Sequence, residues 1–143
     1  MRTSDTPPVF IAGRVMACMS SNVLAPRVLR TCARVADRLG AKWYAVYVET
    51  PRERPGRIGT DDSQALQRNI ALAESLGATV VKVRADRPSD GLIAFAQREG
   101  ITDVVFGETG RSRWELLWRG STIDRFARTV RAAAVQVVPL DVR

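Results

Sequence analysis

The sequence predicts one α/β domain: a doubly wound, mostly parallel five-stranded sheet between two layers of helices, a flavodoxin- or Rossmann-like three-layer sandwich. Short apolar runs rich in β-branched residues alternate with longer segments whose apolar residues recur three and four positions apart, in the order β-α-β-α-β-α-β-α-β. Such alternation requires parallel strands joined by right-handed helical crossovers. The 143 residues suit one core, and no internal repeat is visible.

Each element has its own signal. Strands are expected at residues 14–19, 43–48, 78–83, 102–107 and 134–140. Polar capping residues precede each intervening helix, and glycines follow the first three helices. The apolar stripes place Leu39 in the first helix and Ala127 in the last on buried faces, and Pro139 fits an edge strand. Residues 1–13 are expected to be a disordered or extended lead-in to a folded domain at 14–143.

The composition limits the classes of function. The chain carries 22 Lys and Arg residues against 15 Asp and Glu residues, a net charge of +7. This excess favours anionic partners, and an arginine-rich surface without a partner would also produce it. No apolar stretch reaches 18 residues and no signal peptide is visible, so we expect no transmembrane segment and a cytoplasmic location. Met1 favours a complete small protein, and a piece of a longer protein stays open.

Catalytic chemistry has little support in the sequence. Histidine, the usual general base, is absent, and no set of nucleophile, base and acid can be assembled. Cys18 and Cys32 are expected to be buried, reduced thiols, and two cysteines do not make a metal site. There is no recognition-helix signature for DNA. The sequence therefore predicts a ligand-binding or regulatory domain, not an enzyme, with no metal site and no DNA partner.

A ligand site is expected where two predicted strands end. In an open α/β sheet, ligands bind beyond the carboxyl ends of the strands, at the point where the strand order reverses. The first strand is followed by Ser20, Ser21 and Asn22, and the fourth ends at Gly107. If these strands are neighbours, their loops form two walls of one crevice, and helix N-termini there offer free N–H groups to an anion.

The segment GETGRSRWELLWRGST, residues 107–122, has the composition of a phosphate-binding loop. Glycines let the backbone turn and approach a ligand closely, hydroxyl residues at the entry to the last helix can cap it or hold a phosphate, and arginines can reach a polyphosphate. The candidate residues are Gly107, Gly110, Arg111, Arg113, Gly120, Ser121 and Thr122. An ordinary loop between a strand and a helix remains the alternative.

The spacing Gly107-x2-Gly110-x9-Gly120-Ser121 resembles the motif of the ATP-binding branch of the universal stress protein superfamily. Within it, the chain most resembles the stress-protein-like domain of KdpD-type potassium-sensor histidine kinases. The stretches that carry this likeness are RVLRTCARVADRLGAKWYAVYVETPR, LAESLGATVVKV, RSRW and DRFAR. The resemblance implies the strand order 3-2-1-4-5. It also implies that the glycine loop holds the phosphates of ATP, which Mg²⁺ accompanies. An Asp usually follows the first strand, where this chain has Met19 or Ser20, so the adenine contact stays open.

Cyclic di-AMP is a second nucleotide that the resemblance suggests. Some KdpD-type domains bind it through Ser-x-Ser, twenty residues, then Phe-Thr-Ala-x-Tyr. This chain has Ser20-Ser21-Asn22, twenty residues, then Trp43-Tyr44-Ala45-Val46-Tyr47. Ser20, Ala45 and Tyr47 match, and an asparagine and a tryptophan can still hydrogen-bond and stack.

Several other residues have both a structural and a functional interpretation. Glu49 is expected to form a cap or a salt bridge, or to contact a ribose. Trp114 and Trp118 are expected to cover the edge of the crevice or to dock another domain. The last helix carries three arginines, three residues apart: Arg125, Arg128 and Arg131. They are expected to form either a solvated face or a surface for an acidic partner or an anionic lipid.

Two function hypotheses follow. The first is a regulatory domain that binds an adenine nucleotide in potassium-sensing, osmotic or stress signalling, together with other domains of a sensor kinase. The second is a ligand-free module for protein interaction, in which the tryptophans and the arginine face dock a partner. Relatives suggest a homodimer through the last strand, Ala134 to Leu140.

Overall fold

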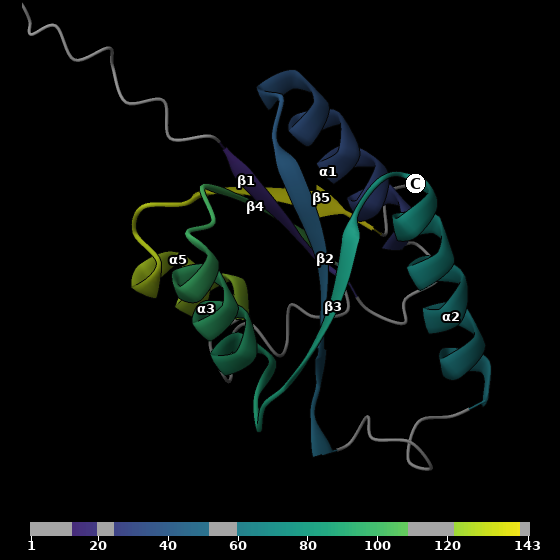
Figure 1. Cartoon of the computed structure of the whole chain (residues 1–143). Helices are drawn as coiled ribbons and strands as arrows, with labels where there is room; N and C mark the ends of the chain where they lie inside the picture. Colours follow the sequence, from purple (N-terminus) through teal and green to yellow (C-terminus); the bar gives the residue numbers. More distant parts are fainter. Residues whose placement is uncertain (1–12, 20–24, 52–59, 109–121, 141–143) are drawn as a thin grey trace, which may run out of the picture.

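The computed structural model describes residues 13–19, 25–51, 60–108 and 122–140, which form a five-stranded parallel sheet with helices on both faces (Figure 1). The strand order is β3-β2-β1-β4-β5, as the resemblance implies. The strands are β1 Arg14–Cys18, β2 Lys42–Glu49, β3 Thr79–Arg84, β4 Asp103–Glu108 and β5 Ala134–Pro139. The helices are α1 Ala25–Leu39, α2 Thr60–Ser75, α3 Pro88–Glu99 and α5 Thr122–Thr129. The predicted fold class is confirmed.

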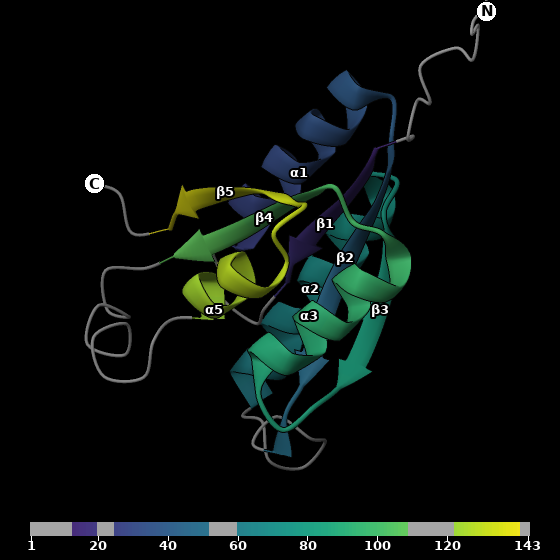
Figure 2. The same cartoon turned by 90° about the vertical axis from the view of Figure 1, so that its left-hand side faces the viewer.

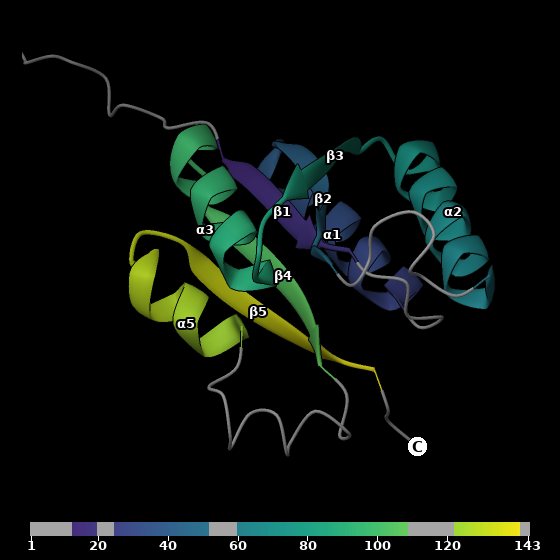
Figure 3. The ribbon, with the colours of Figure 1, turned by 90° about the horizontal axis from the view of Figure 1, so that it is seen from below.

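Helices cover the sheet in pairs. α1 and α2 lie on one face, and α3 and α5 lie on the other, as Figures 1 and 3 show from two directions. β2 is buried on both faces because its side chains alternate between the two layers: Ala45 packs with α1 and α2, whereas Val46 packs with α3 and α5. On the second face, Phe106 and Phe126 meet edge to face at 5.3 Å between ring centroids.

Glycine ends the predicted helices as expected. Gly40, Gly77 and Gly100 have φ values of 60°, 94° and 65°. This left-handed conformation is easily reached only without a Cβ atom. At the third of these, Ile101 N donates to Ala96 O at 3.0 Å and closes the last turn of α3. The glycines therefore set the chain direction into the strands that follow.

Two predicted core positions are wrong, and both lie in the last turns of helices. Leu39 is 49% exposed, because the last residue of α1 does not pack against the sheet. Ala127 is exposed, because α5 has only eight residues and packs mainly through Phe126. α1 is described from Ala25 on, and the capping residues predicted at 20–22 lie outside the described residues, so that part stays a prediction.

Candidate functional site

The carboxyl ends of β1 and β4 are neighbours in the centre of the sheet. Ala17 of β1 is paired with Val105 of β4, and β1 lies between β2 and β4. β4 then continues beyond β1 and pairs with β5 as far as Glu108. The strand order therefore reverses between β1 and β4, as the predicted crevice requires, and the chain leaves both strands at the same edge of the sheet (Figure 3).

Most of the residues predicted to touch a ligand fall outside the described part of the chain. They are Ser20, Ser21, Asn22, Gly110, Arg111, Arg113, Gly120 and Ser121, together with Trp114 and Trp118. Four predicted site residues are described, and they are Tyr47, Glu49, Gly107 and Thr122. Thr122 is the first residue of α5 and is half-buried, so it stands at the helix entry as expected.

Gly107 lies inside β4, where it is paired with Val138, and not at a turn. A Cβ atom at this position would lie 2.7 Å from Val28 Cγ2 of α1 and 2.7 Å from Leu140 Cδ1. Carbon atoms do not approach so closely, so the missing side chain makes room for α1 and for the end of β5. The prediction that the backbone turns at Gly107 is therefore wrong, because packing explains the glycine.

Tyr47 and Glu49 lie on the face of β2 that α1 and α2 cover. Tyr47 is 4% exposed and belongs to the core. The Glu49 carboxylate is also 4% exposed, and it lies 3.1 Å from Arg84 Nε and 3.8 Å from Lys82 Nζ. Two neighbouring cations on β3 offset the cost of taking this carboxylate out of water. Of the roles predicted for Glu49, the structure therefore supports the salt bridge.

The arginines of α5 are held by carboxylates. Arg125 Nη2 lies 3.3 Å from Asp90 Oδ1 of α3, and Arg128 Nε lies 3.3 Å from Asp124 Oδ2 one turn earlier. The first pair ties α5 to α3, which lie side by side in Figure 2. Much of the charge on the α5 face is therefore neutralised within the domain.

The two thiols are poor nucleophiles. Burial raises the pKa of Cys18 well above its ordinary value. Burial, and next the Asp103 carboxylate, raise the pKa of Cys32 to about 12. Both cysteines are free and carry little thiolate at neutral pH. Within the described ranges, no three His, Cys, Asp or Glu side chains gather to hold a metal ion.

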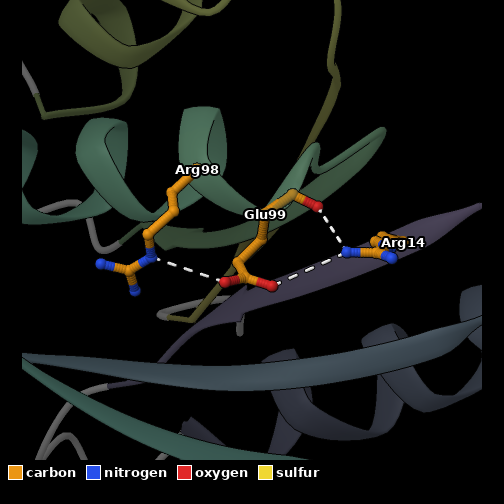
Figure 4. A network of polar contacts seen from close by, with 3 residues as sticks. All are labelled: Arg14, Arg98 and Glu99. Carbon is orange, nitrogen blue, oxygen red and sulfur yellow. Dashed lines mark hydrogen bonds and ion pairs between the residues drawn. The ribbon is translucent and has the colours of Figure 1, made fainter.

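A polar network at the opposite end of the strands joins β1 to α3. Arg14 Nη1 donates to the Glu99 carbonyl at 2.9 Å and lies 3.7 Å from its carboxylate, which also pairs with Arg98 at 3.4 Å (Figure 4). The backbone N–H of Thr102 donates a hydrogen bond to the Arg14 carbonyl oxygen at 2.9 Å. These contacts fix the amino ends of β1 and β4 relative to each other, and so help to align their carboxyl ends.

Known proteins are similar to this chain in sequence and in fold. The pattern of the universal stress protein family matches residues 12–138. The sensor protein KdpD of Clostridium acetobutylicum is 32% identical over 117 residues, which are 82% of this chain and 12% of that protein. KdpD of Escherichia coli is 30% identical over 128 residues, 89% of this chain and 14% of that protein. The chain thus spans only a small part of the length of these relatives.

Solved structures give the same result for the fold. A universal stress protein in complex with cAMP superimposes with a TM-score of 0.69 at 19% identity, over 90% of this chain and 98% of that one. A protein of the universal stress protein family from Burkholderia pseudomallei superimposes with a TM-score of 0.63 at 17% identity, over 92% of this chain and 99% of that one. No helix of the described ranges has both the length and the apolar character to cross a bilayer. On its sequence pattern and its strand order, the chain belongs to the universal stress protein family.

Proposed function

We propose that this domain binds an adenine nucleotide beyond the carboxyl ends of β1 and β4, and that ATP is its preferred ligand. The observation that carries the proposal is the strand order, which makes β1 and β4 neighbours. The segments that follow the two strands, which begin after Cys18 and after Glu108, therefore start from one edge of the sheet. The glycine spacing of the ATP-binding branch begins at Gly107 in β4 and is complete in the second segment.

The proposed roles follow from the chemistry of the residues. Backbone amides of Gly110 and Gly120, with the hydroxyls of Ser121 and Thr122, hold the phosphates at the start of α5, where the helix dipole favours an anion. Arg111 and Arg113 neutralise phosphate charge, and Mg²⁺ accompanies ATP. Gly107 belongs to the same motif but acts through packing. Glu49 is already engaged by Lys82 and Arg84, so we assign it no ribose contact.

Cyclic di-AMP is the second candidate, and the burial of β2 argues against it. The residues at the aromatic part of that motif, Trp43 and Tyr47, are 5% and 4% exposed and pack in the core with α1 and α2. A base can stack only on an aromatic ring with an open face. The cyclic dinucleotide would therefore depend on Ser20, Ser21 and Asn22, and we favour a mononucleotide.

The context of the relatives suggests a regulatory role. The matching relatives are sensor proteins, so we propose that the domain works in the cytoplasm as a regulatory part of potassium-sensing or stress signalling, and that any kinase activity belongs to other domains. A nucleotide can regulate a partner only if it prefers one of two conformations. We also propose a homodimer through β5, the edge strand, where Val137 is 39% exposed. A ligand-free interaction module remains the competing function.

Calorimetry with ATP, AMP and cyclic di-AMP, each with and without Mg²⁺, tests the proposal. We expect heat with ATP and a much weaker response to cyclic di-AMP. Ser121→Ala should weaken ATP binding by about tenfold or more, because one hydrogen bond to a charged group is lost. Ser75→Ala is the matched control, since the Ser75 hydroxyl only donates to Leu72 O on α2. Tighter binding of cyclic di-AMP than of ATP would reverse our choice of ligand.

A further inference from the structure

The outward face of α1 is a straight row of arginines. Their spacing of three, four and four residues keeps all four side chains on the side of the helix away from the sheet. All are exposed, whereas the opposite side of α1 is buried in the core. With a rise of about 1.5 Å per residue, the row is roughly 16 Å long. We refer to it as the α1 stripe: Arg27, Arg30, Arg34 and Arg38.

Within the described part of the chain, no carboxylate pairs with the arginines of the α1 stripe. Among the residues that the structure describes, Arg27, Arg30 and Arg38 form no ion pair, and Arg34 donates to the Thr31 hydroxyl at 3.2 Å. This differs from α5, where Arg125 and Arg128 lie 3.3 Å from carboxylates. The described arginines of α1 therefore differ from those of α5 in having no carboxylate partner, and α1 carries part of the excess that gives the chain its net charge of +7.

We propose that the α1 stripe docks on a bilayer surface that carries anionic phospholipids. Guanidinium groups bind phosphate oxygens through paired N–H donors, and a row of cations on one helix face is typical of helices that adsorb to such surfaces. α1 and α2 form the outer layer on this side of the molecule, so the row can lie parallel to a flat surface (Figure 1). The proposal is independent of nucleotide binding.

The composition of the stripe separates a lipid surface from other anionic partners. A stable protein interface has a core rich in apolar and aromatic residues. α1 contains no aromatic residue, and its exposed apolar residue, Leu39, is at its last position. Binding of single-stranded nucleic acid likewise needs aromatic side chains on which bases stack. A headgroup layer is bound through charge alone, and charge is what the α1 stripe provides.

Vesicle co-sedimentation of the purified chain tests the proposal. The probes are phosphatidylcholine vesicles with and without phosphatidylglycerol, at low and at physiological salt. The test variant is Arg30→Gln with Arg38→Gln, which removes two exposed cations for which the described residues provide no ion pair. The matched control is Arg125→Gln with Arg128→Gln, which changes the net charge equally on the other face of the sheet. Circular dichroism verifies that all three proteins are folded.

The expected result is binding to the anionic vesicles only, weaker at higher salt. Each arginine near an anionic surface contributes roughly fivefold in affinity, so the α1 variant should bind about thirtyfold more weakly. The control should stay within about twofold of the wild type. No binding of the wild type to anionic vesicles would overturn the proposal. So would an equal loss in both variants, or tighter binding to an RNA homopolymer at equal phosphate concentration.

Discussion

Gly107 is a residue of the glycine motif that also has a packing role in the fold. Its bare Cα lets Val28 of α1 and Leu140 pack against β4, so it positions the helix that begins beside the proposed crevice. Gly107→Ala should lower the free energy of unfolding by about 1–3 kcal/mol, the usual cost of overpacking a core. Urea denaturation measures this change.

The control for this substitution is Gly13→Ala. A Cβ atom at Gly13 would meet its nearest neighbour, Ala41 Cβ, at 3.4 Å, which is an ordinary contact. This variant should be nearly neutral or slightly stabilising, because alanine has less backbone entropy to lose on folding. Equal stabilities of the two variants would contradict the packing role of Gly107.

Cys32 predicts how stability depends on pH. Burial and Asp103 raise its pKa from an ordinary value of 9.0 to about 12. Between these values the folded state holds the proton more tightly than the unfolded state, so stability is full below pH 9.0 and falls as the pH rises towards about 12. Cys32→Ala removes this contribution, and its unfolding free energy should fall less steeply between pH 9 and 10.5, by up to about 1.4 kcal/mol per pH unit. If the unfolding free energies of the wild type and of Cys32→Ala fell in parallel with pH, the proposed contribution of Cys32 would be wrong.

At the scale of elements, the salt bridge between β2 and β3 is predicted to stabilise the fold. Of the two cations that the described residues place beside the buried Glu49 carboxylate, Arg84→Gln leaves Lys82, at 3.8 Å. We expect a loss of about 1–3 kcal/mol, because a buried charge loses a partner. Arg128→Gln should cost less than about 0.5 kcal/mol, since both side chains of its ion pair with Asp124 are exposed, at 78% and 54%. Thermal or urea unfolding compares the two, and a smaller loss for Arg84→Gln would refute this account of Glu49.

The arrangement of strands and helices could be predicted because it depends on local patterns. Apolar periodicity and three helix-ending glycines placed the described elements to within a few residues. Leu39 and Ala127 were assigned wrongly, because periodicity gives the inward side of a helix but not whether the sheet reaches that far.

Contacts between distant residues could not be predicted in the same way. The fit of Gly107 depends on Val28 and Leu140, which are far from it in the sequence. The sequence offers an arginine row on the last helix as well as on the first, and only the packing of α5 on α3 shows that Asp90 neutralises Arg125. That the arginines of α1 have no carboxylate partner among the described residues is likewise visible only in the folded domain.

At the scale of the whole molecule, β5 is an open sheet edge, and the proposed homodimer should depend on it. Val137→Lys should shift the chain towards the monomer in analytical ultracentrifugation, because a charge on an edge strand prevents pairing with a second strand. Leu39→Lys is the matched control, since Leu39 is 49% exposed but lies at the end of α1. A wild-type monomer, or an equal shift with both variants, would remove β5 from the proposed interface.

Nucleotide binding is the claim on which the functional account depends. The most direct measurement is the dissociation constant of ATP for the wild-type chain and for Gly120→Val, by calorimetry on folded protein. We predict measurable binding by the wild type and a loss of at least about tenfold in the variant, because a branched side chain prevents the backbone from approaching the phosphates. No heat with the wild type, or equal affinities for the two proteins, would contradict the account.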